Sequence, residues 1–272
     1  MRNYKIVFVD IDDTLNPTNE YVSEKNKQVL SKLKEKGIIT VVCTGRCINY
    51  SVNKSKEALM SNYVIGSNGT EVYDYENNKI IFERTIPKDI VKSVYEYCCK
   101  TNITLLFNSM NNRFINNKEY TYNDEKVIYF DNIDKLLSEN DINQMCMLSD
   151  NYDRMLLIPN MFKEKYPSLN IVHSSKELVN GIREHGKEYY HDIVMENTSK
   201  STGVVELLDY LGIDSNDAIS IGNGYDDICV FDVVGTSVAV DNSNDSVKSM
   251  ATYVTKSCNE DGVAFILEKL CL

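Results

Sequence analysis

Short apolar runs in the first part of the chain alternate with segments of helical pattern. The run Ile6–Val9 has no polar residue and contains β-branched side chains, which is typical of a strand covered on both faces. Similar runs at 38–42 and 63–65 predict two more strands. A helix that Ser23 can cap is expected after the first strand, and another at 54–60 after the second. This order predicts a parallel sheet with right-handed crossovers.

The pattern changes after the third strand. Residues 71–75 and 79–83 alternate more nearly with period two around Asn77-Asn78, which predicts a hairpin, and Pro87 fits the first turn of a helix. The segment that follows is rich in Asn, Tyr and Lys and has only short signals. The first pattern then returns, with expected strands at 192–195, 218–221 and 236–240 and helices at 200–211 and 262–270.

We therefore predict an α/β protein with a Rossmann-like parallel-sheet core that is split by a smaller inserted α+β cap domain. The predicted core comprises residues 1–84 and 188–272, and the predicted cap comprises residues 85–187.

Charge and cysteine content narrow the class of protein. The 272 residues carry a net charge of −11, which argues against a nucleic-acid partner because binding to a phosphate backbone relies on clustered Lys and Arg. The eight cysteines form no C-x-x-C pair, so reduced thiols are expected rather than a zinc site or a disulfide framework. We see no signal peptide and no apolar stretch of the ~20 residues that span a bilayer, so we expect no membrane partner and a cytoplasmic location.

Acidic residues follow the first predicted strand in the run Asp10-Ile11-Asp12-Asp13-Thr14. Ligands of open parallel sheets bind at the carboxyl ends of the strands, and two carboxylates that share a pocket need a neutralising charge such as a divalent metal ion. Asp10 could then attack phosphorus, with Asp12 as general acid and base. The alternative is an acidic surface turn, because turns favour Asp.

Three other segments lie at the same predicted edge. Thr44-Gly45-Arg46 follows the second strand and can hold phosphoryl oxygens, or it can simply cap a helix. Lys200 opens a helix and suits a phosphoryl group, although most lysines are solvated. The loop Gly222–Asp227 offers oxygens from Asn223, Asp226 and Asp227, or it can be a glycine-rich turn that Asp226 caps.

The order and residue types of these four motifs resemble those of the haloacid dehalogenase superfamily, in particular its Cof-type (IIB) hydrolases. Ser67-Asn68-Gly69-Thr70 and Asp261-Gly262-Val263-Ala264 are also similar to segments of that family. The resemblance implies that Asp10 forms a phosphoaspartyl intermediate, that Asp12 is the general acid and base, and that a cap selects a small phosphorylated metabolite. The resemblance further implies that the phosphate group is bound by Ile11, Thr44, Gly45, Lys200 and Asp226. It also implies that the ligands of Mg²⁺ are Asp10, Asp12, Asn223 and Asp227.

One motif departs from the family pattern, which reads Gly-Asp-Gly-x-Asn-Asp. Here Asn223 stands where the family has its metal-binding Asp, and Asp226 stands where the family has Asn. A neutral amide oxygen neutralises less metal charge than a carboxylate does. Our hypothesis is that metal affinity is weaker than usual while activity survives.

Other readings remain open beside the phosphatase. A phosphomutase of the same superfamily would keep Asp10 and Asp12 but return the phosphoryl group to a sugar. A chain with Asn223 could also bind a phosphorylated metabolite without turnover. A receiver-like signalling module is a third alternative, but such modules lack the Asp-x-Asp-x-Thr spacing and the large insert that this chain has. In the insert, Arg113, Arg183 and His185 could contact a charged substrate, but solvated surface positions are expected for them.

Overall fold

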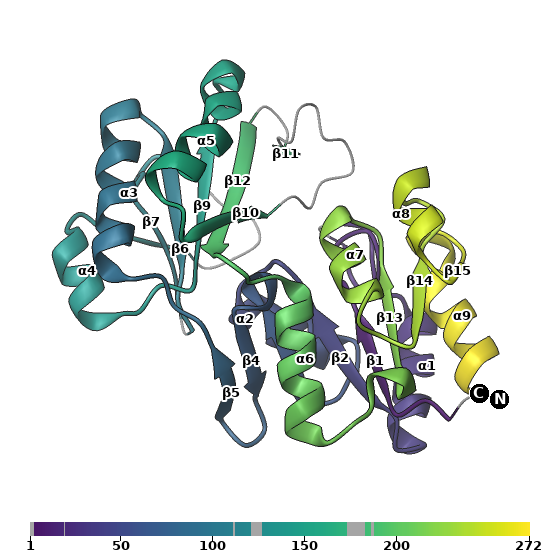
Figure 1. Ribbon diagram of the computed structural model, residues 1–272. Coiled ribbons are helices and arrows are strands. Elements are labelled where there is room, and N and C mark those ends of the chain that lie inside the picture. Colours follow the sequence, from purple (N-terminus) through teal and green to yellow (C-terminus); the bar gives the residue numbers. More distant parts are fainter. Residues whose placement is uncertain (1–2, 19, 111, 121–126, 173–182, 186–187) are drawn as a thin grey trace.

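The computed structural model describes residues 3–272 except 19, 111, 121–126, 173–182 and 186–187, and these residues form two sheets with their own helices (Figure 1). The first sheet has the strand order β15-β14-β13-β1-β2-β3-β4-β5. The first six strands are parallel, β4 pairs antiparallel with β3, and β5 pairs antiparallel with β4. Its strands are β1 Ile6–Val9, β2 Ile39–Cys43, β3 Tyr63–Gly66, β4 Glu71–Asp74, β5 Lys79–Glu83, β13 Ala218–Gly222, β14 Thr236–Ala239 and β15 Tyr253–Val254.

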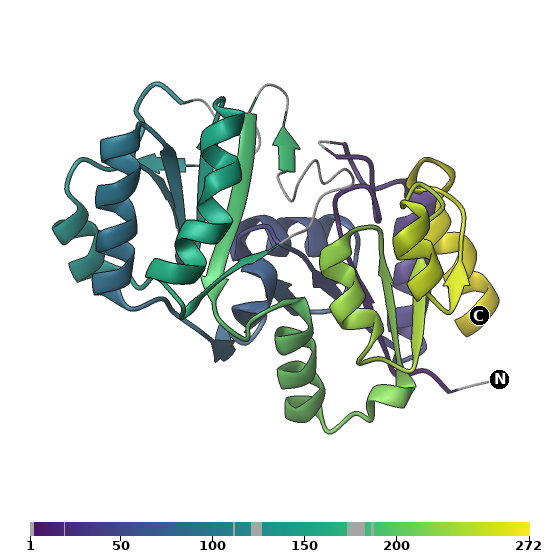
Figure 2. The same ribbon diagram turned by 45° about the horizontal axis from the view of Figure 1, so that its top comes forward.

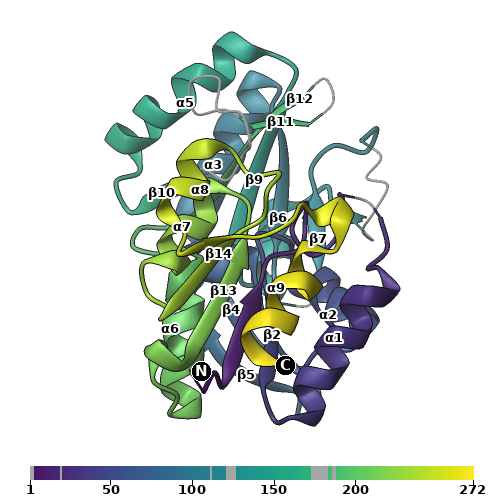
Figure 3. The same ribbon diagram turned by 90° about the vertical axis from the view of Figure 1, so that its right-hand side faces the viewer.

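Helices cover both faces of this sheet, which explains why β1 is apolar at successive positions. Val7 and Val9 pack in the cluster that includes α1 and α9, whereas Ile6 and Phe8 pack in the cluster that includes α6 and α7. Figure 3 shows α1 and α9 on one side of the sheet and α6 and α7 on the other. The helices of this part are α1 Glu24–Glu35, α2 Ile48–Glu57, α6 Lys200–Leu211, α7 Tyr225–Phe231, α8 Asp245–Met250 and α9 Gly262–Cys271, with short 3₁₀ turns η1 Ser67–Gly69, η2 Ser215–Asp217 and η3 Cys258–Glu260.

The second sheet has the order β10-β12-β9-β6-β7-β8, and β11 pairs with β12. One of its faces packs against α3, α4 and α5, which lie on the side away from the first sheet in Figures 1 and 2. The other face carries a small apolar cluster of Leu106, Ile115, Cys146 and Leu148. The elements are β6 Thr104–Asn108, β7 Arg113–Ile115, β8 Val127–Tyr129, β9 Gln144–Ser149, β10 Leu169–Val172, β11 Arg183–His185, β12 Glu188–Met195, α3 Lys88–Thr101, α4 Ile133–Glu139 and α5 Tyr152–Lys165.

Most predicted elements of the first sheet form where the sequence places them. Ser23 caps α1 by accepting a hydrogen bond from the amide of Asn26 at 3.1 Å, and Asn78 adopts a positive φ of 49° in the β4–β5 hairpin. Helix α2 begins at Ile48, six residues before the expected start at 54. Cys47 precedes it and makes no side-chain cap hydrogen bond, so the usual Ser, Thr or Asp signal of a helix start is missing. The predicted α/β class with a parallel core sheet is confirmed.

The strand expected at 192–195 belongs to β12, and its place in the fold differs from the expectation. We predicted that the core resumes at residue 188, but β12 pairs with β9, β10 and β11, which lie in the second sheet. An apolar run shows that a strand forms, but does not show which edge it joins. No helix among the described residues has both the length and the apolar character needed to cross a bilayer.

Candidate active site

Lys200 lies at the centre of a buried group of charges. Ser199 caps α6 in a capping box with Thr202, so Lys200 is the first helical residue. Its Nζ contacts Asp10 Oδ1 at 2.9 Å, Asp226 Oδ2 at 3.0 Å and Asp227 Oδ1 at 2.8 Å, and the Lys200 side chain is only 2% exposed. Three of the four sequence motifs, which are far apart in the chain, therefore meet at the carboxyl edge of the sheet.

The charges of this group act on each other strongly because water is excluded. Burial raises the pKa of Asp10 well above its ordinary value; the Lys200 ammonium opposes this rise, while Asp227 and Asp226 reinforce it. Burial alone would lower the pKa of Lys200, but the three carboxylates outweigh that effect and raise it. One ammonium for three carboxylates leaves an excess of negative charge.

The loop after β13 is held in place by hydrogen bonds from its backbone to the Asp227 side chain. Asp227 Oδ2 accepts hydrogen bonds from the amides of Asn223 and Gly224, both at 2.9 Å. Gly222 must lack a side chain, because a Cβ there would lie 2.3 Å from the Asp227 carboxyl carbon. Gly224 is therefore the N-cap of α7 and Asp227, in its first turn, bonds back to the Gly224 amide; the sequence interpretation had offered Asp226 as the cap.

Asn223 and Asp12 have partners that sequence reasoning did not assign. Asn223 Oδ1 accepts a hydrogen bond from Thr14 Oγ1 at 3.1 Å, which ties the first motif to the last. Asp12 accepts two hydrogen bonds from Arg46, one from Nε and one from a terminal nitrogen, both at 2.9 Å. The signal that could have revealed this pair is that Arg46, in the second motif, lies at the same predicted sheet edge as the acidic run, since an arginine fork binds a carboxylate with two bonds.

Thr44 and Gly45 lie at the end of β2, on the strand next to β1. The buried Thr44 hydroxyl accepts a hydrogen bond from the amide of Arg46 at 3.3 Å. A Cβ on Gly45 would lie 2.9 Å from Asn68 Oδ1, so this glycine makes room for Asn68. The side chain of Ile11 is fully buried in the hydrophobic core, which leaves only its backbone for a contact with phosphate.

A divalent metal ion fits this group by the chemistry of its donors. Asp10, Asp12, Asn223 and Asp227 offer the hard oxygens that Mg²⁺ prefers. In the described part of the chain, no group of three or more acidic, His or Cys side chains is arranged to hold a metal ion; the three carboxylates named above surround the Lys200 ammonium instead. An Mg²⁺ ion would therefore need the Asn223 amide or a backbone carbonyl beside one or two carboxylates, which agrees with its habit of keeping several waters.

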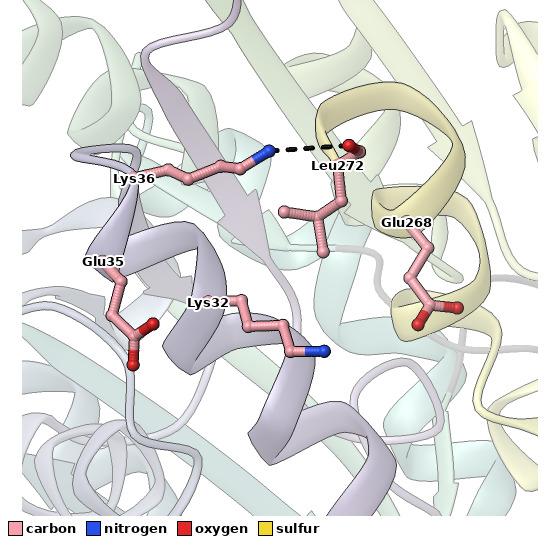
Figure 4. A pocket seen from close by; sticks show the side chains of 5 residues that line it. All are labelled: Lys32, Glu35, Lys36, Glu268 and Leu272. Atoms are coloured by element: carbon pink, nitrogen blue, oxygen red, sulfur yellow. Dashed lines mark hydrogen bonds between the residues drawn. The ribbon is translucent and has the colours of Figure 1, made fainter.

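Features outside this group carry less chemistry. A surface hollow of about 690 Å³ is lined by Lys32, Glu35, Lys36, Glu268 and Leu272 (Figure 4). It lies where α1 ends before β2, at the edge opposite the charged group. In the second sheet Arg113 is 7% exposed, so its expected solvated position is wrong, while the side chains of Arg183 and His185 lie outside the described residues.

Comparisons with known proteins identify the family. The chain belongs to the haloacid dehalogenase-like hydrolases, because the model of that family matches residues 7–267. The resemblance inferred from the four motifs is thereby confirmed, and the chain is a hydrolase.

Similar proteins match over the full length of the chain. The chain is 28% identical to a Streptococcus pyogenes protein provisionally named a bifunctional phosphatase and peptidyl-prolyl cis-trans isomerase, and covers 55% of that longer protein. It is 24% identical to the 5-amino-6-(5-phospho-D-ribitylamino)uracil phosphatase YwtE of Bacillus subtilis, with 98% of each chain covered.

Two solved structures share the fold. A haloacid dehalogenase-like hydrolase of Bacteroides thetaiotaomicron superposes with a TM-score of 0.85 at 22% identity, over 98% of this chain and 99% of that one. The subclass IIB sugar phosphatase BT4131 has a TM-score of 0.77 at 21% identity, over 97% and 98% of the two chains.

Proposed function

We propose that the chain is a magnesium-dependent phosphatase that hydrolyses small phosphate monoesters through an aspartyl-phosphate on Asp10. The observation that carries this proposal is the contact of the buried Lys200 ammonium with Asp10, Asp226 and Asp227 at the end of β1. A carboxylate beside a fixed cation at the carboxyl edge of a parallel sheet is placed for attack on phosphorus. The phosphatase names of relatives at 28% and 24% identity support the same reaction.

The proposed reaction has two steps. An Asp10 oxygen forms a bond to phosphorus while the ester oxygen leaves and takes a proton from Asp12. Asp12 then takes a proton from water, whose oxygen attacks phosphorus and releases Asp10 and inorganic phosphate. Lys200 offsets charge on the phosphoryl group, and Thr44 can donate a hydrogen bond to it. A bound Mg²⁺ would supply the remaining positive charge, held by Asp10, the Asp12 backbone carbonyl, Asn223 and Asp227.

Arg46 constrains the proton transfer in this scheme. Both Asp12 oxygens accept hydrogen bonds from Arg46. A protonated Asp12 keeps one oxygen as an acceptor for Arg46 and directs its O–H toward the leaving group. Arg46 is therefore proposed as the residue that orients the general acid and base.

We further propose that the second sheet and its helices form a cap over the core and select the substrate. The sequence predicted a core of residues 1–84 and 188–272. Because β12 pairs with β9 of the second sheet, we assign β12 to the cap, so that the proposed cap extends to Met195. The proposed substrates are phosphorylated metabolites such as sugar phosphates. The proposed cytoplasmic location rests on the sequence.

Replacing the nucleophile tests the reaction. Wild type and Asp10→Asn are incubated with Mg²⁺ and a panel of phosphorylated metabolites, and released phosphate is measured. We expect Asp10→Asn to lose at least about a thousandfold in kcat, because the amide is a poor nucleophile. Equal phosphate release by the two proteins would refute the proposal. A bisphosphate-primed transfer assay on the same proteins separates hydrolysis from mutase activity.

A further inference from the structure

Asn68 is a fully buried residue of the core that contacts the cap. It follows β3 in a left-handed conformation with φ 57° and ψ 36°, which Asn tolerates better than most residues. The backbone N–H of Asn68 donates to the Thr44 carbonyl at 3.2 Å, and the Asn68 side chain occupies the space that Gly45 leaves open. Asn68 is thus packed against the loop to which we assign phosphate binding.

The cap meets Asn68 with polar side chains from two of its central strands. Asn68 Nδ2 donates to Gln144 Oε1 of β9 at 3.2 Å and to Asp192 Oδ2 of β12 at 3.4 Å. Gln144 Nε2 in turn donates to the Gly45 carbonyl at 3.4 Å, and all of these side chains are buried. Beside them, Asn108 Nδ2 donates to Ser67 Oγ at 3.4 Å.

We propose that Asn68, Gln144 and Asp192 form a latch that holds the cap on the core and positions the Thr44–Gly45 loop for catalysis. The proposal rests on the proposed phosphatase function for its catalytic consequence, but not for the contact itself. Asn68 is a positioning residue in this scheme, because it acts through the loop and not on phosphate.

The geometry of the latch suits a contact that must open at each turnover. Its hydrogen bonds are long, at 3.2 to 3.4 Å. The buried Asn68 Oδ1 accepts no hydrogen bond from the described residues in the closed arrangement, and water can satisfy it once the cap lifts. When the cap lifts, these polar groups exchange their hydrogen bonds for hydrogen bonds to water, so the closed state is only slightly more stable than the open state. Substrate binding can therefore decide which of the two states is populated.

Two single variants break the latch from opposite sides. Asn68→Asp keeps a residue that tolerates positive φ but places a carboxylate against Asp192, so the two repel. Gln144→Ala removes the cap partner on an ordinary strand position without adding charge. The double variant Asn68→Asp/Asp192→Asn restores a donor–acceptor pair with the direction reversed. Asn117→Ala is the matched control, because the Asn117 side chain donates to Thr104 and accepts from the Glu119 amide, both within the cap.

Small-angle X-ray scattering and steady-state kinetics with Mg²⁺ and p-nitrophenyl phosphate provide the readouts. We expect a larger radius of gyration and a roughly tenfold lower kcat/KM for each single variant, the equivalent of about one lost hydrogen bond. The double variant should recover toward wild type in both, and Asn117→Ala should match wild type.

The two proposals fail in different ways. Wild-type scattering curves for Asn68→Asp and Gln144→Ala would overturn the latch whatever the activity. If wild type released no phosphate while the single variants still expanded, the proposed function would fail and the latch would stand. Loss of activity without rescue by the double variant and without expansion would reduce Asn68 to a structural residue and overturn the proposal.

Discussion

Asp12 and Arg46 show how one side chain can set the working state of another. The guanidinium group holds the carboxylate through two hydrogen bonds of 2.9 Å and stacks 4.9 Å from the centre of the Tyr50 ring. Two parallel bonds fix both the position and the orientation of the carboxylate, which a lysine ammonium cannot do. The position of Asp12 therefore depends on the shape of Arg46 as well as its charge.

Arg46→Lys separates these two contributions. We expect kcat for p-nitrophenyl phosphate to fall about tenfold, because Lys keeps the charge but loses the paired bonds. Arg84→Lys is the control, since Arg84 donates to Asn197 and Thr198 and not to a residue of the charged group. An unchanged kcat in Arg46→Lys would show that orientation by Arg46 does not matter.

Glu71 is a fully buried carboxyl group beside the Ser67 side chain. Burial raises its pKa from 4.5 to about 7; a hydrogen bond with the Ser67 side chain opposes this rise, and the nearby Glu83 reinforces it. The folded chain thus keeps a proton that the unfolded chain loses as pH rises above 4.5, so this residue reduces stability increasingly between pH 4.5 and about 7.

Glu71→Gln should remove that decline, because an amide does not titrate. Relative to wild type, we expect the variant to gain up to about 3 kcal/mol of unfolding free energy between pH 5 and pH 8. Urea unfolding at both pH values measures the gain, with the exposed Glu76→Gln of the same hairpin as control. Parallel pH profiles for Glu71→Gln and wild type would contradict the assigned pKa.

At the scale of elements, the start of α6 is positioned by a close approach to β3 and η1. A Cβ on Gly203 would lie 2.5 Å from Ile65 Cγ2 and 3.2 Å from Gly69 Cα, and a Cβ on Gly69 would lie 2.0 Å from the Ser199 carbonyl oxygen. These two glycines let the helix rest directly on the sheet, one turn from Lys200.

Gly203→Ala should therefore move the helix and its lysine together. We expect a loss of about 1–3 kcal/mol in stability, as for other overpacked sites, and a lower kcat because Lys200 shifts away from Asp10. Gly212→Asn, at the other end of α6, is the control: its φ is 64°, and a Cβ there has nothing within 4 Å. Wild-type stability and kcat in Gly203→Ala would show that the contact is not tight.

Elements with a strong local signal could be predicted from the sequence, whereas their partners could not. The apolar run of β1 and the cap of α1 depend on neighbouring residues, and both form as expected. The pairing of β12 with β9 and the burial of Arg113 depend on contacts between distant segments, and both differ from the expectation. In the candidate site, residue types drew attention to Asp10 and Lys200, which the structure brings into contact, but the Asp12–Arg46 and Thr14–Asn223 pairs required geometry.

At the scale of the whole molecule, negative charge limits the binding of an anionic substrate. The chain carries a net charge of −11, and Asp10, Asp226 and Asp227 surround one lysine. A phosphate monoester would be repelled unless a divalent cation joined the site. We therefore expect chelation of Mg²⁺ to weaken binding of inorganic phosphate as well as to stop turnover.

Asn223→Asp tests how the departure from the family motif changes this balance. A carboxylate at 223 can still accept the Thr14 hydrogen bond, but it adds a charged ligand to the metal site. We expect Mg²⁺ to bind roughly tenfold more tightly by isothermal titration calorimetry, since affinity in oxygen sites rises with ligand charge. Asn78→Asp adds the same charge at the hairpin tip, where Tyr73 donates to the side-chain oxygen of Asn78, and should leave Mg²⁺ affinity unchanged. Unchanged binding in Asn223→Asp would mean that residue 223 does not set metal affinity and that Asp226 is the better candidate for the ligand, and weaker binding would contradict the expected gain from a charged ligand.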